Sequence, residues 1–92
     1  MKVRKEGGFF MHQVSIKFNN VDQVQQFVNI IEKFEAHFDL SSQQRVVNAK
    51  SIIAICALDL SKPLSLRYTL EDDRNGKADS IMEKITPFLY VG

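Results

Sequence analysis

The spacing of hydrophobic residues in this 92-residue chain switches repeatedly between a strand period of two and a helical period of about 3.6, which limits the possible folds. Alternation predicts a half-buried strand over residues 13–18. Apolar residues spaced i, i+3, i+4, i+7 and i+10 from Val24 predict a helix over residues 21 to about 35. Two short strands around residues 38–40 and 45–47 follow as a hairpin, whose turn lacks the usual glycine or Asn-Gly pair.

The second half of the chain shows the same change of period. Ser51 directly precedes an apolar run and predicts the N-cap of a short helix that ends near Asp59. Residues 64–70 alternate more clearly than any other stretch and predict a strand. A solvated turn at residues 71–76 leads to a last helix with an apolar stripe, which Pro87 should end or kink.

The resulting order, βαββαβα, predicts an α+β fold. One-sided strands and amphipathic helices imply two layers, in which all three helices cover the apolar face of an open four-stranded sheet. A ferredoxin-like arrangement shares the first six elements, so the pattern alone leaves both arrangements open.

Length and composition indicate one small domain, because 92 residues of which 45% are hydrophobic can bury a modest core unaided. Residues 1–11 lack periodicity, so we expect a mobile N-terminal extension before a domain of residues 12–92. The basic residues 1–5 imitate the start of a signal peptide, but the apolar run that follows is too short for one, and no stretch approaches the ~18 apolar residues of a membrane span. The single cysteine, Cys56, excludes an internal disulfide and suits a reducing compartment. We therefore expect a cytoplasmic protein that does not associate with membranes.

Charge and aromatic content argue against a nucleic-acid partner. Twelve Lys+Arg and 11 Asp+Glu give a formal charge of +1, which creates no attractive field for phosphates. A single-stranded RNA binder on a similar scaffold would need exposed aromatic residues on central strands. Tyr68, however, should share the apolar face of its strand with Leu66 and Leu70. We also expect no cofactor and no metal ion.

Three short motifs resemble a known family. They are Val14-Ser15-Ile16 in the first strand, Gln26-Phe27-Val28 in the first helix and Asn48-Ala49-Lys50-Ser51-Ile52 before the second helix. They resemble the HPr family, the histidine phosphocarrier proteins of the bacterial sugar phosphotransferase system. The resemblance implies an HPr-like open-faced β-sandwich, with a mostly antiparallel sheet and three helices on one face. It also implies a phosphoryl carrier at most, and not an enzyme.

The active loop of that family, G-x-H-x-R-P, has no counterpart here. The corresponding residues are Asn20, Val21 and Asp22, in a shorter loop. Asn20 has no nucleophilic nitrogen, and the carboxylate of Asp22 would repel a phosphoryl group that an arginine would hold. The rise per residue of a strand places His12 about 26 Å from this loop, and that of a helix places His37 about 20 Å from it. We expect both histidines to be surface residues without a function.

The resemblance therefore implies a regulatory or protein-interaction module that is not phosphorylated on histidine. The alternative is an active phosphocarrier with a divergent loop. Expected partners are phosphotransferase-system enzymes, a serine kinase or a transcriptional regulator.

Two further features of the second helix follow from the resemblance. Ser51 matches a regulatory phosphoacceptor of some family members; a plain N-cap is the favoured interpretation, and the two roles are compatible. Ile52, Ile53 and Cys56 match the apolar residues that the family presents to partners. The competing interpretation is that this helix packs only into the core, and for Cys56 we expect a buried small hydrophobe.

The apolar tail, residues 88–91, has two possible roles. It can fold back on the sheet or pair with a second chain.

Overall fold

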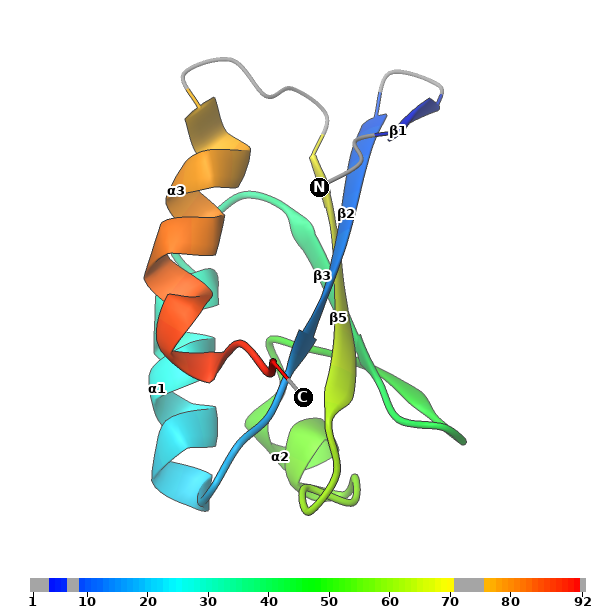
Figure 1. Ribbon diagram of the computed structural model, residues 1–92, viewed down its shortest axis with the longest axis vertical. Helices are drawn as coiled ribbons and strands as arrows, with labels where there is room; N and C mark the ends of the chain where they lie inside the picture. The colour runs from blue at the N-terminus through cyan, green and yellow to red at the C-terminus, as the bar shows by residue number, and fades with distance from the viewer. Residues whose placement is uncertain (1–3, 7–8, 71–75, 92) are drawn as a thin grey trace.

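The computed structural model describes residues 4–6, 9–70 and 76–91, and these form one sheet covered on one face by helices (Figure 1). Most of the expected turn at residues 71–76 lies outside the described residues. The strands are β1 (Arg4–Glu6), β2 (Phe9–Ile16), β3 (His37–Ser41), β4 (Val46–Asn48) and β5 (Leu64–Leu70). The helices are α1 (Val21–Ile31), α2 (Ile52–Cys56) and α3 (Lys77–Ile85), and the 3-10 turn η2 (Thr86–Phe88) follows α3. The predicted α+β class and the single helical layer are confirmed, and the elements βαββαβα occur in the predicted order. The described part of the sheet has five strands rather than four, because β1 was not predicted.

The strand order in the sheet is β1-β2-β5-β3-β4, and every described pair is antiparallel. β5 lies at the centre, where Tyr68 is opposite His12 on one side and Phe38 on the other. Its four alternate apolar residues are buried, as the sequence pattern predicted.

The first predicted strand is longer than its hydrophobic pattern indicated. β2 begins at Phe9 rather than at residue 13, and Phe9–Met11 pair with Arg4–Glu6 of β1. Backbone pairing with a neighbouring strand does not require alternating side chains, so the pattern contained no signal for it. The boundary proposed at residue 11 falls inside β2, and the mobility of residues 1–11 stays a prediction.

The core lies between the sheet and the helices. α1 buries Val24, Phe27, Val28 and Ile31, the stripe predicted from its spacing. The helix ends at Ile31 rather than near residue 35. The amides of residues 32–34 then bond carbonyls within the last turn.

The tail folds back on the sheet in this structure. The backbone amide of Lys17 donates to the carbonyl of Phe88 (2.9 Å), and the amide of Tyr90 donates to the carbonyl of Ser15 (2.9 Å). Phe88 is 4% exposed and meets the rings of Phe18 and Phe27 at centroid distances of 5.9 and 5.6 Å. The three rings close the core beside the connection from β2 to α1.

Replacing Phe88→Ala should destabilise the protein by about 3 kcal/mol or more, because it removes a buried ring from this cluster. The control is Val91→Ala, whose side chain is 96% exposed and should matter by less than about 0.5 kcal/mol. Urea denaturation measures both variants. Equal stability of the two variants would show that the tail contributes nothing to the core.

Candidate functional site

The first turn of α1 is held by a pair of side-chain hydrogen bonds. Asn20 is the N-cap, and its Oδ1 accepts from the backbone amide of Gln23 (2.9 Å). Oε1 of Gln23 accepts in turn from the backbone amide of Asn19 (2.7 Å). This is a variant of the capping box, and the Asn-x-x-Gln spacing in the sequence could have predicted it.

The connection from β2 to α1 has little freedom to rearrange. Lys17 is bonded to the tail through its amide, and Phe18 is 2% exposed in the aromatic cluster. Asn19 and Asn20 are then held by the cap. Val21 and Asp22 are exposed at the start of the helix, with Val21 at 57%.

The prediction of a surface position for His12 is wrong. His12 is 4% exposed, and its ring stacks on Tyr68 with centroids 5.0 Å apart and planes 9° from parallel. Its position, two residues before Val14 and four before Ile16, places it on the same strand face, which the period of two could have shown. His37 is exposed at the first residue of β3, as expected. Neither histidine lies in the loop before α1 or in its first turn.

The second helix begins as predicted. Ser51 is the N-cap of α2, and its Oγ accepts from the backbone amide of Ala54 (3.3 Å). The preceding residue, Lys50, donates from Nζ to the carbonyl of Phe34 (3.0 Å) just after α1. The same ammonium lies 5.5 Å from the ring centroid of Phe38. These contacts tie the start of α2 to the far end of α1, and α2 packs against α1 (Figure 1).

The helix itself is only five residues long, Ile52–Cys56, and it has two apolar faces. Ile55 is fully buried, and Ile52 is partly buried against the core. Ile53 is 86% exposed and shares the outer face with Cys56, three residues further on. The prediction of a buried Cys56 is therefore wrong, because a single helical turn cannot turn every residue of an apolar run towards the core.

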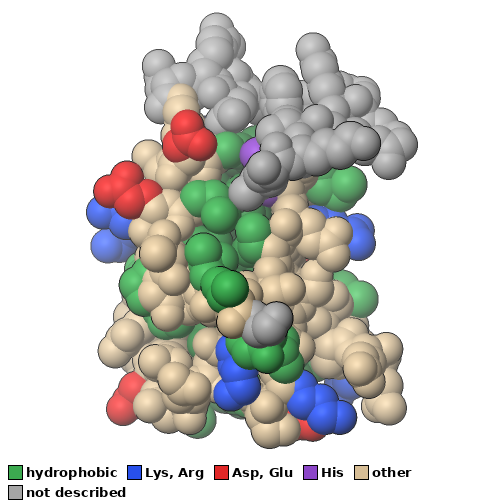
Figure 2. All heavy atoms as spheres, in the orientation of Figure 1, with side chains coloured by type: hydrophobic (Ala, Val, Ile, Leu, Met, Phe, Trp, Pro, Cys, Tyr) green, Lys and Arg blue, Asp and Glu red, His purple; other side chains and the backbone are tan. Residues whose placement is uncertain are grey.

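The structure thus separates the three candidate partner-binding residues. Ile53 and Cys56 face outward, whereas Ile52 turns towards the core. We refer to Ile53 and Cys56 as the outer face of α2. On the face of the molecule drawn in Figure 2, acidic and basic side chains are dispersed and do not gather into one charged patch.

Comparisons with known proteins identify the fold. No protein-family model matches the sequence, and no curated protein matches it. Among solved structures, the chain is similar to the phosphocarrier protein HPr from Bacillus anthracis str. Ames, with a TM-score of 0.62 and 20% identity over 89% of this chain and 98% of that one. It is also similar to HPr-C-His from Thermoanaerobacter tengcongensis, with a TM-score of 0.59 and 21% identity over 84% and 86%.

These neighbours establish that the chain has the fold of HPr phosphocarrier proteins. The expectation of an HPr-like open-faced β-sandwich is confirmed, and the comparison decides against the ferredoxin-like arrangement. Within the described residues, no helix is long and apolar enough to cross a membrane.

Replacing Ser51→Ala should destabilise the protein by about 1 kcal/mol, because the amide of Ala54 loses its acceptor. Ser80→Ala is the matched control, since Ser80 is exposed on α3 and its removal should change stability by less than about 0.5 kcal/mol. Thermal and urea denaturation measure both. Equal effects would mean that the cap of α2 adds nothing to stability.

Proposed function

We propose that this protein is an interaction module related to the sugar phosphotransferase system, which docks partner proteins through the outer face of α2 and does not carry phosphate on histidine. The observation that supports docking best is the 86% exposure of Ile53. Together with the exposed Cys56 it forms a small apolar surface on a capped helix, which a partner protein can cover. The partners that fit are phosphotransferase-system enzymes or a transcriptional regulator in a bacterial cytoplasm.

The start of α1 supports the proposal that this protein does not carry phosphate on histidine. A phosphocarrier needs an imidazole nitrogen as nucleophile and a cation with free amides to hold the phosphoryl group. In this chain the side chain of Asn20 occupies the amide of Gln23, and the carboxylate of Asp22 is exposed in the same turn. That turn favours a stable helix start over the binding of an anion.

The competing function is an active phosphocarrier with a divergent loop. It would require one of the two histidines to receive the phosphoryl group. His12 is stacked on Tyr68 inside the core, and His37 begins β3 after the far end of α1. Their positions favour the interaction module.

Regulation of the docking face is a second proposal. Ser51 is partly exposed at the start of α2, two residues before Ile53. A serine kinase that phosphorylated Ser51 would place negative charge beside the docking face and change its partners.

Docking can be tested by competition. The protein should inhibit phosphorylation of an authentic HPr by enzyme I and phosphoenolpyruvate while itself acquiring no acid-labile phosphate. Ile53→Glu should abolish this inhibition, because it places a charge in the apolar contact. Val91→Glu, at a 96% exposed valine in the tail, should leave the inhibition unchanged.

Two results would contradict the proposal. Absence of inhibition by the unaltered protein would rule out docking to enzyme I. Acid-labile label on this protein itself would establish the active phosphocarrier instead.

A second experiment asks whether the missing histidine and arginine side chains alone explain the expected lack of phosphorylation, or whether the short loop also prevents it. Asn20→His with Asp22→Arg should stay unlabelled, because the connection from Lys17 to Asn20 is held by the tail, the core and the cap. An imidazole misplaced by about 1 Å can lose about 100-fold in rate. Grafting the whole G-x-H-x-R-P loop should restore labelling. Substantial labelling of the double variant would show that the short loop already positions a histidine correctly.

A further inference from the structure

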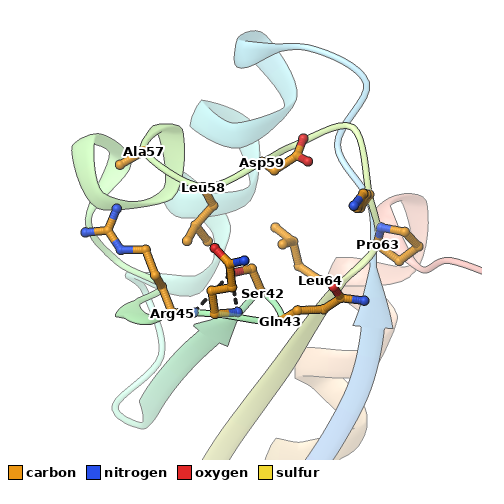
Figure 3. A pocket seen from close by; sticks show the side chains of 10 residues that line it. Ser42, Gln43, Arg45, Ala57, Leu58, Asp59, Pro63 and Leu64 are labelled. Atoms are coloured by element: carbon orange, nitrogen blue, oxygen red, sulfur yellow. Dashed lines mark hydrogen bonds between the residues drawn. The ribbon is translucent and has the colours of Figure 1, made fainter.

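A pocket of about 610 Å³ lies beyond the end of α2, between the β3–β4 turn and the loop that leads into β5 (Figure 3). Its volume falls within the range of about 300–1,000 Å³ that is usual for small-molecule sites. No step of the proposed docking function uses it. The lining residues come from three separate segments, 42–45, 57–59 and 62–64.

The wall formed by the β3–β4 turn is held in one shape by Ser42. Its Oγ accepts from the backbone amides of Gln44 (3.3 Å) and Arg45 (3.2 Å), and its own amide donates to the carbonyl of Arg45 (2.9 Å). These bonds explain how the turn closes without glycine. They also hold the backbone from which Arg45 extends.

The opposite wall is held by Asp59. Its Oδ1 accepts from the hydroxyl (2.6 Å) and the backbone amide (3.1 Å) of Ser61. These two bonds, with a smaller contribution from the nearby Lys62 ammonium, hold the pKa of Asp59 below its ordinary value. Asp59 is therefore ionised at neutral pH, and its carboxylate is already hydrogen-bonded to Ser61. The carboxylate turns away from the two leucines of the pocket (Figure 3).

The floor and the rim of the pocket have different chemistry. Leu58 and Leu64 face each other at the base of the pocket and are only 6% and 2% exposed (Figure 3). The exposed Ala57 and Pro63 therefore supply apolar floor that a ligand can reach. Arg45 and Lys62 contribute two cations from opposite walls, and both residues are exposed. The side-chain amides of Gln43 and Gln44 add further donors at the rim.

From this arrangement we propose that the pocket binds a small phosphomonoester with an apolar body. A phosphate ester has a charge of about −2 near neutral pH, and a guanidinium can bind two of its oxygens at once. Two cations outweigh the single carboxylate of Asp59, which is turned to Ser61. The pocket, at about 610 Å³, exceeds what inorganic phosphate fills, so an organic group of the ester lies against its apolar floor.

The test is titration of the full chain with phenyl phosphate, inorganic phosphate and phenol, followed by chemical shifts of the Leu58 and Leu64 methyl groups. Phenyl phosphate should shift both residues saturably and bind about 10-fold tighter than inorganic phosphate, because its ring is buried. Phenol should bind more weakly than phenyl phosphate, because it lacks the charge.

Matched variants locate the cations that bind. Arg45→Gln and Lys62→Gln should each weaken phenyl phosphate about 10-fold, the loss expected for one charge-assisted contact. The controls are Arg67→Gln and Lys33→Gln, exposed cations that do not line the pocket, and these should leave affinity unchanged. Dispersed amide spectra establish that each variant is folded.

Three outcomes would overturn the assignment. They are no saturable shift with phenyl phosphate, equal weakening by the pocket and control variants, and equal affinity for phenyl phosphate and inorganic phosphate. Each can occur whether or not the outer face of α2 docks a protein, so failure here leaves the competition experiment unaffected.

Discussion

Burial of one face of β5 is the interaction on which the rest of the structure depends. β5 is the only described strand that pairs with two long neighbours, β2 and β3, and all four residues of its apolar face are buried. Those residues can leave water only if helices cover that face, so α1 and α3 pack on it. The aromatic cluster around Phe88 then closes the layer at the end of the chain.

The short length of α2 accounts for the proposed docking surface. A longer amphipathic helix would reserve one face for the core and one for water. A five-residue helix made from an uninterrupted apolar run must leave part of that run outside, and Ile53 is the result. The core contact of Ile55 and the bonds made by Ser51 and Lys50 hold this exposed side chain on a defined backbone.

The candidate site was partly predictable from the sequence. The Ser51 cap follows from a local rule, a hydroxyl immediately before an apolar run, and the structure confirms it. The cap formed by Asn20 and Gln23 follows an equally local rule, the Asn-x-x-Gln spacing. The positions of Cys56 and His12 were mispredicted, because burial depends on which neighbour packs against each face.

The sequence by itself determined the type and order of the main elements and the apolar side of each, because periods of two and 3.6 are properties of neighbouring residues. It also showed that the loop before α1 contains neither histidine nor arginine. Tertiary structure alone decided the central place of β5, the pairing of β1 and the return of the tail to β2. It also brought Arg45 and Lys62 to one pocket. These features join residues far apart in the chain. Hydrophobic spacing describes only residues close together in sequence, so it cannot predict such contacts.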